Sequence, residues 1–259
     1  DFNMPAPDRY GTQSALELLR QHVDYGGWYD LRTHRLMRVQ QTQLLAAMDP
    51  SAGSFSVSDR TQRHFATLAC PFPEAEAVHA LFLAVFAGHL GAFRADVGRL
   101  AEPVVAASLA LHREVSVAFA PTAAKFTYQW TLRELSRVFE GLCLSAPEYF
   151  SSPLPMVRLW LHESRRVYGD RLVTEQDRAR FAETLTRVAK NFFEEFSQAE
   201  LQAEPLVFAS FAGSAGGGDD GGLARPYLPV SDYEKLRKLL EGQLRLYNES
   251  RARMDLVLF

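Results

Sequence analysis

The first forty residues change from a turn-rich pattern to a helical pattern and back. Residues 1–12 are rich in Asp, Asn, Pro and Gly, which predicts a loop. Residues 13–25 place apolar side chains on one face at helical spacing, and Gly26 marks the end of the predicted helix. Residues 28–40 then predict a short hairpin with residues 32–34 at its tip.

Two compact apolar runs follow the predicted hairpin. QLLAAM, at residues 43–48, ends at Asp49, and HFATLAC, at residues 64–70, is closed by Pro71. Runs of this length between loop signals are typical of buried strands in a parallel sheet. A helix, a buried strand, a loop and a second buried strand in this order predict part of an α/β sheet.

Beyond about residue 74 the apolar positions keep helical spacing. They predict five helices, over about 100–118, 131–142, 154–168, 174–192 and 231–247. Two of these helices begin with a capping-box signature, Thr131 with Glu134 and Ser231 with Glu234. Between the last two helices, GSAGGGDDGG at 213–222 predicts a flexible insertion.

The two patterns divide the chain into two parts. We predict an α/β plus α fold, in which residues 1–95 form a truncated α/β region and residues 96–249 form a helical subdomain. The composition is ordinary for a globular protein, since 47% of the residues are hydrophobic and 23% are charged. Composition therefore does not alter the predicted fold and is useful mainly for arguing against certain classes of partner.

Charge and apolar run length argue against two classes of partner. Neutralising a nucleic-acid backbone needs a basic face, so a net charge of −3 argues against nucleic acid. The longest uninterrupted apolar run, Ala80 to Gly88, is too short to span a bilayer, so no membrane partner is expected. Cys70 and Cys143 lack a CxxC pattern and are expected to be reduced core residues of an intracellular protein. The start DFNMPAPDRYG carries neither a secretion signal nor an initiator Met, which predicts a fragment or a processed chain.

The chain carries no self-sufficient catalytic or metal-binding motif. His162-Glu163 is followed by Arg166 where a zinc protease needs a second His, and no metal site is expected. A GxSxG nucleophile elbow is missing. The glycine run at 213–222 contains two Asp but no GK[ST], so it would repel a phosphate.

A likeness to a known family covers nearly the whole chain. DFNMPAPDRYGTQSALELLRQHVDYGGWYD resembles the stretch that follows the Walker B strand in the third AAA+ module of dynein heavy chains, most of all those of axonemal type. The likeness continues in the same order through RTQRHFATLACPFP, FTYQWTLRELSRVFEGL, VRLWLHESRRVYGDRLV, YLPVSDYEKLRKLLEGQLRLYNE and MDLVLF. The resemblance implies part of an AAA+ large subdomain, then a helical AAA+ lid, with residues 250–259 leading into the fourth module.

The same resemblance implies a function for the parent protein. That protein would be an ATP-driven, minus-end-directed microtubule motor for cilium and flagellum movement, located in the cytoplasm, the cytoskeleton and the ciliary axoneme. The intact module would bind ATP or ADP with Mg²⁺. Its partners would be the neighbouring AAA+ modules and, through the parent, the microtubule and the intermediate and light chains. The Walker A loop would lie upstream, so the fragment alone is expected to be inactive.

Two acidic positions take site roles from the resemblance. Asp1 matches the Walker B carboxylate, which polarises the attacking water, although most AAA+ sites use the longer Glu. The alternative is an Asp that caps a loop. Asp49 falls in the region of the first sensor, usually a polar amide. A carboxylate near a γ-phosphate is repelled, so a plain strand-end Asp is an equal alternative.

Two arginines take the remaining roles. Arg63 matches the arginine finger that acts on the preceding module's nucleotide, with Arg60 as the fallback and a solvated arginine as the alternative. Arg133 matches the second sensor, whose guanidinium would face the phosphates of the module's own nucleotide. Its alternative is a surface arginine or a partner of Glu134. Lys125 and Tyr128 also fit the family pattern, without an assigned role.

Two function classes stay open at this point. The first is a regulatory, nucleotide-binding segment of the motor ring that works with its upstream half. The second is a non-enzymatic segment whose helices only brace neighbouring modules. The nucleotide content of an intact ring would separate them.

Overall fold

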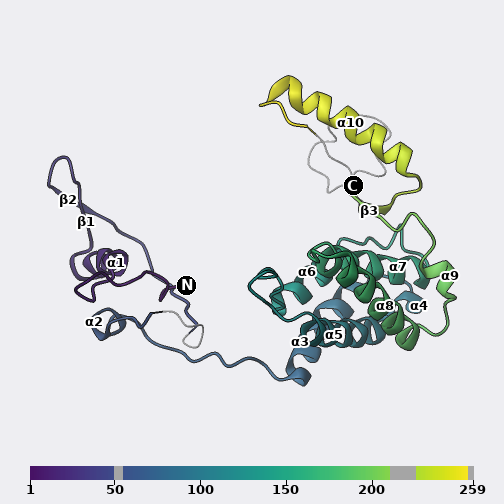
Figure 1. The fold of residues 1–259 in the computed structure, drawn as a ribbon, viewed down its shortest axis with the longest axis horizontal. Helices are drawn as coiled ribbons and strands as arrows, with labels where there is room; N and C mark the ends of the chain where they lie inside the picture. Colours follow the sequence, from purple (N-terminus) through teal and green to yellow (C-terminus); the bar gives the residue numbers. More distant parts are fainter. Residues whose placement is uncertain (50–54, 211–225, 256–259) are drawn as a thin grey trace. The chain divides into compact units, whose positions relative to one another are not determined.

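The computed structural model describes residues 1–49, 55–210 and 226–255, which form two compact units, residues 1–72 and 73–259 (Figure 1). The first unit contains α1 (Ser14–Tyr25), β1 (Gly27–Tyr29), β2 (Leu36–Arg38) and α2 (Asp59–Gln62). The second contains α3 (Ala75–Leu90), α4 (Ala95–Gly98), α5 (Ala101–Ala118), α6 (Leu132–Leu142), α7 (Pro153–Ser164), the π-helix η1 (Arg165–Gly169), α8 (Glu175–Phe192), α9 (Gln198–Leu201), β3 (Phe208–Ala209), β4 (Leu228–Pro229) and α10 (Tyr233–Ser250). The predicted change from mixed to helical structure is confirmed.

The predicted helix and hairpin of the first unit are both present, and GGWYD joins them. Gly26 ends α1 with φ of 71°, a left-handed conformation that glycine adopts without strain. Gly27 pairs with Arg38, and a Cβ at Gly27 would lie 2.0 Å from the Met37 carbonyl oxygen. Trp28 then donates its indole N–H to the Leu18 carbonyl at 2.7 Å, which fastens the hairpin to α1.

The two predicted buried strands are wrong. Residues 43–48 and 64–70 form no strand, and Leu45 is 92% exposed while Leu68 is 84% exposed. A buried parallel strand needs hydrogen-bonded neighbours on both sides and covered faces. Among the described residues of this unit, no segment forms a strand beside residues 43–48 or 64–70, so these apolar runs are not part of a sheet.

The second unit is a helical bundle with one contiguous apolar core. Its largest fully buried side chains are Trp160, Tyr128, Tyr168, Phe86, Phe150 and Phe193. Phe139 of α6 stacks on Phe82 of α3 with ring centroids 4.7 Å apart, so α3 packs within this unit. The unit boundary therefore falls at residue 72, whereas the sequence division placed residues up to 95 with the first part.

Three further details differ from the expectations or fall outside the structure. α10 begins at Tyr233 with Asp232 as its cap, because the Asp232 carboxylate accepts the N–H of Glu234 at 3.0 Å. The expected Ser231 capping box is therefore wrong. Cys70 is exposed rather than a core residue, while Cys143 is half-buried. The expected insertion at 213–222 lies outside the described residues.

Candidate functional site

The N-terminal residues lie along the segment that leads to Asp49. The Asp1 amino group donates to the Ala47 carbonyl at 2.7 Å, and the Phe2 N–H donates to the same oxygen at 2.9 Å. Asn3 is buried and donates its side-chain amide to the Asp49 carbonyl at 2.9 Å. DFN therefore brings Asp1 and Asp49, the two candidate carboxylates, into one local region of the first unit.

Asp1 lies at the edge of a hollow in the surface of the first unit. Asp1 is exposed and lines a hollow of about 210 Å³ with Phe2, Leu19, Leu44, Leu45, Ala46, Ala47 and Phe65. The hollow is mostly apolar. Among the residues described, no three His, Cys, Asp or Glu side chains gather into a metal-binding group.

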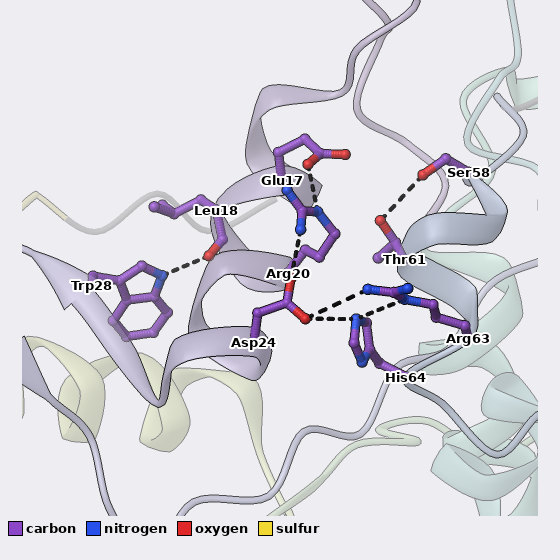
Figure 2. A network of polar contacts seen from close by, with 9 residues as sticks. All are labelled: Glu17, Leu18, Arg20, Asp24, Trp28, Ser58, Thr61, Arg63 and His64. Carbon is purple, nitrogen blue, oxygen red and sulfur yellow. Dashed lines mark hydrogen bonds and ion pairs between the residues drawn. The ribbon is translucent and has the colours of Figure 1, made fainter.

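Arg63 directly follows α2 and lies against the end of α1 (Figure 2). Its Nη2 is 3.8 Å from Asp24 Oδ1, and its Nε is 3.3 Å from His64 Nε2. Asp24 is bound more closely by Arg20 of α1, at 2.5 Å. Most of the Arg63 side chain, 62%, stays exposed. Arg60, the fallback, has no recorded hydrogen bond or ion pair to the described residues.

The predicted capping box at the start of α6 is confirmed. The Thr131 hydroxyl accepts the Arg133 N–H at 3.2 Å, while Glu134 accepts the Thr131 N–H at 2.6 Å. Glu134 is only 3% exposed, and Arg171 neutralises it at 2.9 Å. Arg171 also donates to the Gln129 carbonyl at 2.7 Å, which fixes the approach to the helix.

The same arrangement sets the charge of Glu134. Burial acts to raise the pKa of this carboxyl, but hydrogen bonds from Thr131 and Arg171 outweigh it, so the pKa lies below its usual value. Glu134 is therefore an anion whose hydrogen-bonding capacity is met inside the second unit. It does not pair with Arg133, which is exposed and has no recorded side-chain partner among the described residues.

The structure gives Lys125 and Tyr128 a role that sequence reasoning missed. Both bind Asp177 at the start of α8, with Lys125 Nζ at 2.5 Å and the Tyr128 hydroxyl at 2.8 Å from Oδ2. The Tyr128 hydroxyl also accepts the N–H of Val173 at 2.9 Å. The hydrogen bond from Lys125 is the main cause that lowers the pKa of Asp177 to about 2. No local pattern links residues 49 positions apart, so only the fold shows this clasp.

A second missed cluster surrounds Glu163, in LWLHESRRVYGDRL. Glu163 is fully buried and accepts Arg166 at 2.6 and 2.9 Å and the Tyr227 hydroxyl at 2.7 Å. The Tyr227 hydroxyl also lies 3.0 Å from His162 Nε2. His162 and Glu163 are thus both engaged in this internal cluster. Within the described ranges, no helix is long and apolar enough to cross a membrane.

The four predicted site residues fall into two groups. Asp1, Asp49 and Arg63 belong to the first unit, and Arg133 belongs to the second. Asp1 and Asp49 share hydrogen-bonded backbone, whereas Arg63 is held by a separate network on α1 and α2. Each role must therefore be tested on its own.

Comparisons with known proteins match both units to dynein or AAA+ sequences. A family model described as P-loop containing dynein motor region matches residues 1–73, and a model described as AAA+ lid domain matches residues 104–203. The chain is 44% identical over 260 residues to a dynein beta chain of the flagellar outer arm from Chlamydomonas reinhardtii, and 44% identical over 266 residues to dynein axonemal heavy chain 17 from Mus musculus. It is 40% identical over 261 residues to a ciliary dynein beta chain from Tripneustes gratilla. Each match covers 100% of this chain and 6% of the relative's length.

Proposed function

We propose, from the premise that this chain is a segment of an axonemal dynein heavy chain with an AAA+ lid, that it belongs to the third AAA+ module of the motor ring. It would run from Walker B of that module through the lid, and residues 250–259 would lead into the fourth module. The module would hold ATP or ADP with Mg²⁺ together with its upstream half and transmit its nucleotide state around the ring. The parent would work as a microtubule motor in the axoneme of a cilium or flagellum.

The main observation in support of nucleotide binding is the exposed guanidinium of Arg133. Its helix is fixed at the N-terminus by the Thr131–Glu134 box and by Arg171, yet its own guanidinium is exposed and has no recorded partner among the described residues. A cation on the first turn of a rigid helix is available to an anion that another part of the protein delivers. An exposed guanidinium at this position supports the second-sensor role, and the contacts of Glu134 with Thr131 and Arg171 favour it over a pair between Arg133 and Glu134.

Exposed apolar side chains in the first unit support the same proposal. Residues 43–48 and 64–70 have the composition of central strands, but Leu45 and Leu68 stay exposed among the described residues. The upstream part of the module would pack against these segments and cover their side chains. Asp1 would then lie beside the bound nucleotide, where its carboxylate would orient a water for attack.

The test uses the intact heavy chain. Arg133→Ala is expected to weaken nucleotide retention in its own module, and Arg63→Ala is expected to disturb nucleotide handling in the preceding module. Arg137→Ala is the matched control, since Arg137 is exposed one turn further along α6 and has no recorded partner in the described part of the chain. Equal effects of Arg133→Ala and Arg137→Ala on both sites would refute the sensor role. An intact-ring structure with an empty, collapsed site would instead support a purely bracing segment.

A further inference from the structure

Asp24, at the end of α1, is shared by three partners (Figure 2). Arg20 binds its Oδ2 at 2.5 Å, His64 Nε2 lies 3.1 Å from its Oδ1, and Arg63 Nη2 lies 3.8 Å from Oδ1. Because Arg20 is the closest cation, it compensates most of the carboxylate charge. Arg63 is therefore held loosely, at a distance where its guanidinium is oriented but not locked.

His64 makes the second contact to Arg63. A nitrogen of a neutral imidazole is either a donor or an acceptor. His64 Nε2 therefore either donates to Asp24 or accepts from Arg63 Nε at 3.3 Å, and the two contacts exclude each other. Both Arg63 contacts use the Nε and Nη2 edge of the guanidinium. Its Nη1 has no recorded partner among the described residues.

We propose that Asp24, assisted by His64, is a positioning residue that orients Arg63 toward a phosphate of the preceding module's nucleotide. The inference rests on the proposed finger role of Arg63. Asp24 holds one edge of the guanidinium against α1 and leaves the remaining N–H groups as donors for a phosphate oxygen. Because Arg20 already neutralises most of the charge of Asp24, Arg63 can leave the Asp24 carboxylate and bind a phosphate with little loss of free energy.

The contact with Asp24 restricts the conformations of the Arg63 side chain, although most of that side chain is exposed to solvent. An arginine without such a holder samples many rotamers and loses them all on binding a phosphate. A loose contact to Asp24 restricts this search before the nucleotide arrives. Exposed ion pairs are weak, so the expected contribution is about two- to fivefold in nucleotide retention rather than several orders of magnitude.

The test is made in the intact heavy chain with the nucleotide sites other than that of the preceding module disabled. The release rate of a fluorescent ATP analogue from the preceding module is measured for Asp24→Asn, Arg63→Ala and the double variant. Asp24→Asn keeps the size of the side chain and removes its charge. The matched control is Asp30→Asn, because Asp30 accepts hydrogen bonds from Thr33 and the Arg32 N–H in the same unit without touching Arg63.

We expect Arg63→Ala to speed release, Asp24→Asn to speed it by about two- to fivefold, and Asp30→Asn to leave it unchanged. Asp24→Asn should add nothing once Arg63 is Ala, a coupling that a merely structural role does not produce. Asp24→Glu, which keeps the charge, should restore part of the retention and serves as the informative variant if Asp24→Asn does not fold. Arg63→Ala with an effect but Asp24→Asn without one, or equal effects of Asp24→Asn and Asp30→Asn, would overturn the positioning role alone. No effect of Arg63→Ala would overturn the finger role and this inference with it.

Discussion

Gly141 of α6 faces the buried carboxylate of Glu163 in α7, which makes Gly141→Ala a severe test of the lid's packing. A Cβ at Gly141 would lie 2.1 Å from both Cδ and Oε2 of Glu163. Glu163 is fully buried, and its two oxygens are bound by Arg166 and Tyr227. The carboxylate therefore has no room to move away without breaking these hydrogen bonds.

The expected magnitude follows from three opposing terms. Ala in place of Gly in a helix gains about 1 kcal/mol from backbone propensity. Overpacking of a filled interior costs about 1–3 kcal/mol, and weakening a hydrogen bond to a buried charge costs about 1.5–3 kcal/mol. We expect Gly141→Ala to lower the free energy of unfolding by about 2–4 kcal/mol, which corresponds to a fall of about 5–15 °C in Tm for a unit of this size.

The assay is urea and thermal unfolding of the chain, followed by circular dichroism. Gly242→Ala is the matched control, because Gly242 lies inside α10 with no atom within 4 Å of its added Cβ. It should leave stability unchanged or raise it by up to about 1 kcal/mol. In a Glu163→Ala background, the penalty of Gly141→Ala should nearly vanish, since the obstructing carboxylate is gone. An undiminished penalty there, or unchanged stability of Gly141→Ala alone, would refute the reasoning.

Three further predictions address other contacts. Asp177→Asn should lower the free energy of unfolding by about 1–2 kcal/mol at pH 7. Because the pKa of Asp177 is lowered from 3.8 to about 2, this difference from the unsubstituted chain should shrink as the pH falls from about 4 to 2, which urea unfolding at each pH would measure. Arg171→Leu should destabilise the lid by about 2–4 kcal/mol because it leaves Glu134 buried without its cation, with Arg178→Leu, whose ion pair is exposed, as the control; similar Tm values for the two variants would contradict the pairing. Asp232→Ala should reduce the helicity of α10, at a cost of about 1 kcal/mol, whereas Ser231→Ala should not, and the reverse order in circular dichroism would restore the cap expected from the sequence.

The sequence predicts local structure well where a local rule decides it. The Thr131–Glu134 box, the end of α1 at Gly26 and the helical spacing beyond residue 74 all depend on neighbours within four positions. The cap of α10 shows the limit of such rules. Ser231 and Asp232 are adjacent residues that can both cap a helix, and the side chain of Asp232 is the one that does so.

The sequence fails where the outcome depends on distant partners. The apolar runs 43–48 and 64–70 have strand composition, but a strand also requires a neighbouring strand, and none is available to them in the described structure. Asp177, the partner of Lys125, lies 52 residues further along the chain, and Tyr227 lies 64 residues beyond Glu163. These two contacts are long-range, so no spacing rule could reveal them, whereas the pair of Glu163 with Arg166 has helical i,i+3 spacing.

The candidate site divides in the same way. Asp1, Asp49, Arg63 and Arg133 were selected by resemblance to a family, and the structure adds their surroundings. It shows that Arg133 keeps its guanidinium exposed and that Arg63 is held by Asp24. Asp24 carries no motif that would have singled it out, because its importance depends on α2 packing against α1.

The short β3–β4 ladder has a consequence for how this lid tolerates change. Phe208 pairs with Pro229 and Ala209 pairs with Leu228, and the Tyr227 hydroxyl anchors the second strand to Glu163. The ladder and this hydrogen bond therefore join two segments that are distant in sequence to the buried carboxylate of α7. A change that disrupts the Glu163 cluster should thus also release β4 from β3, so the helices and this ladder are expected to unfold as one cooperative unit.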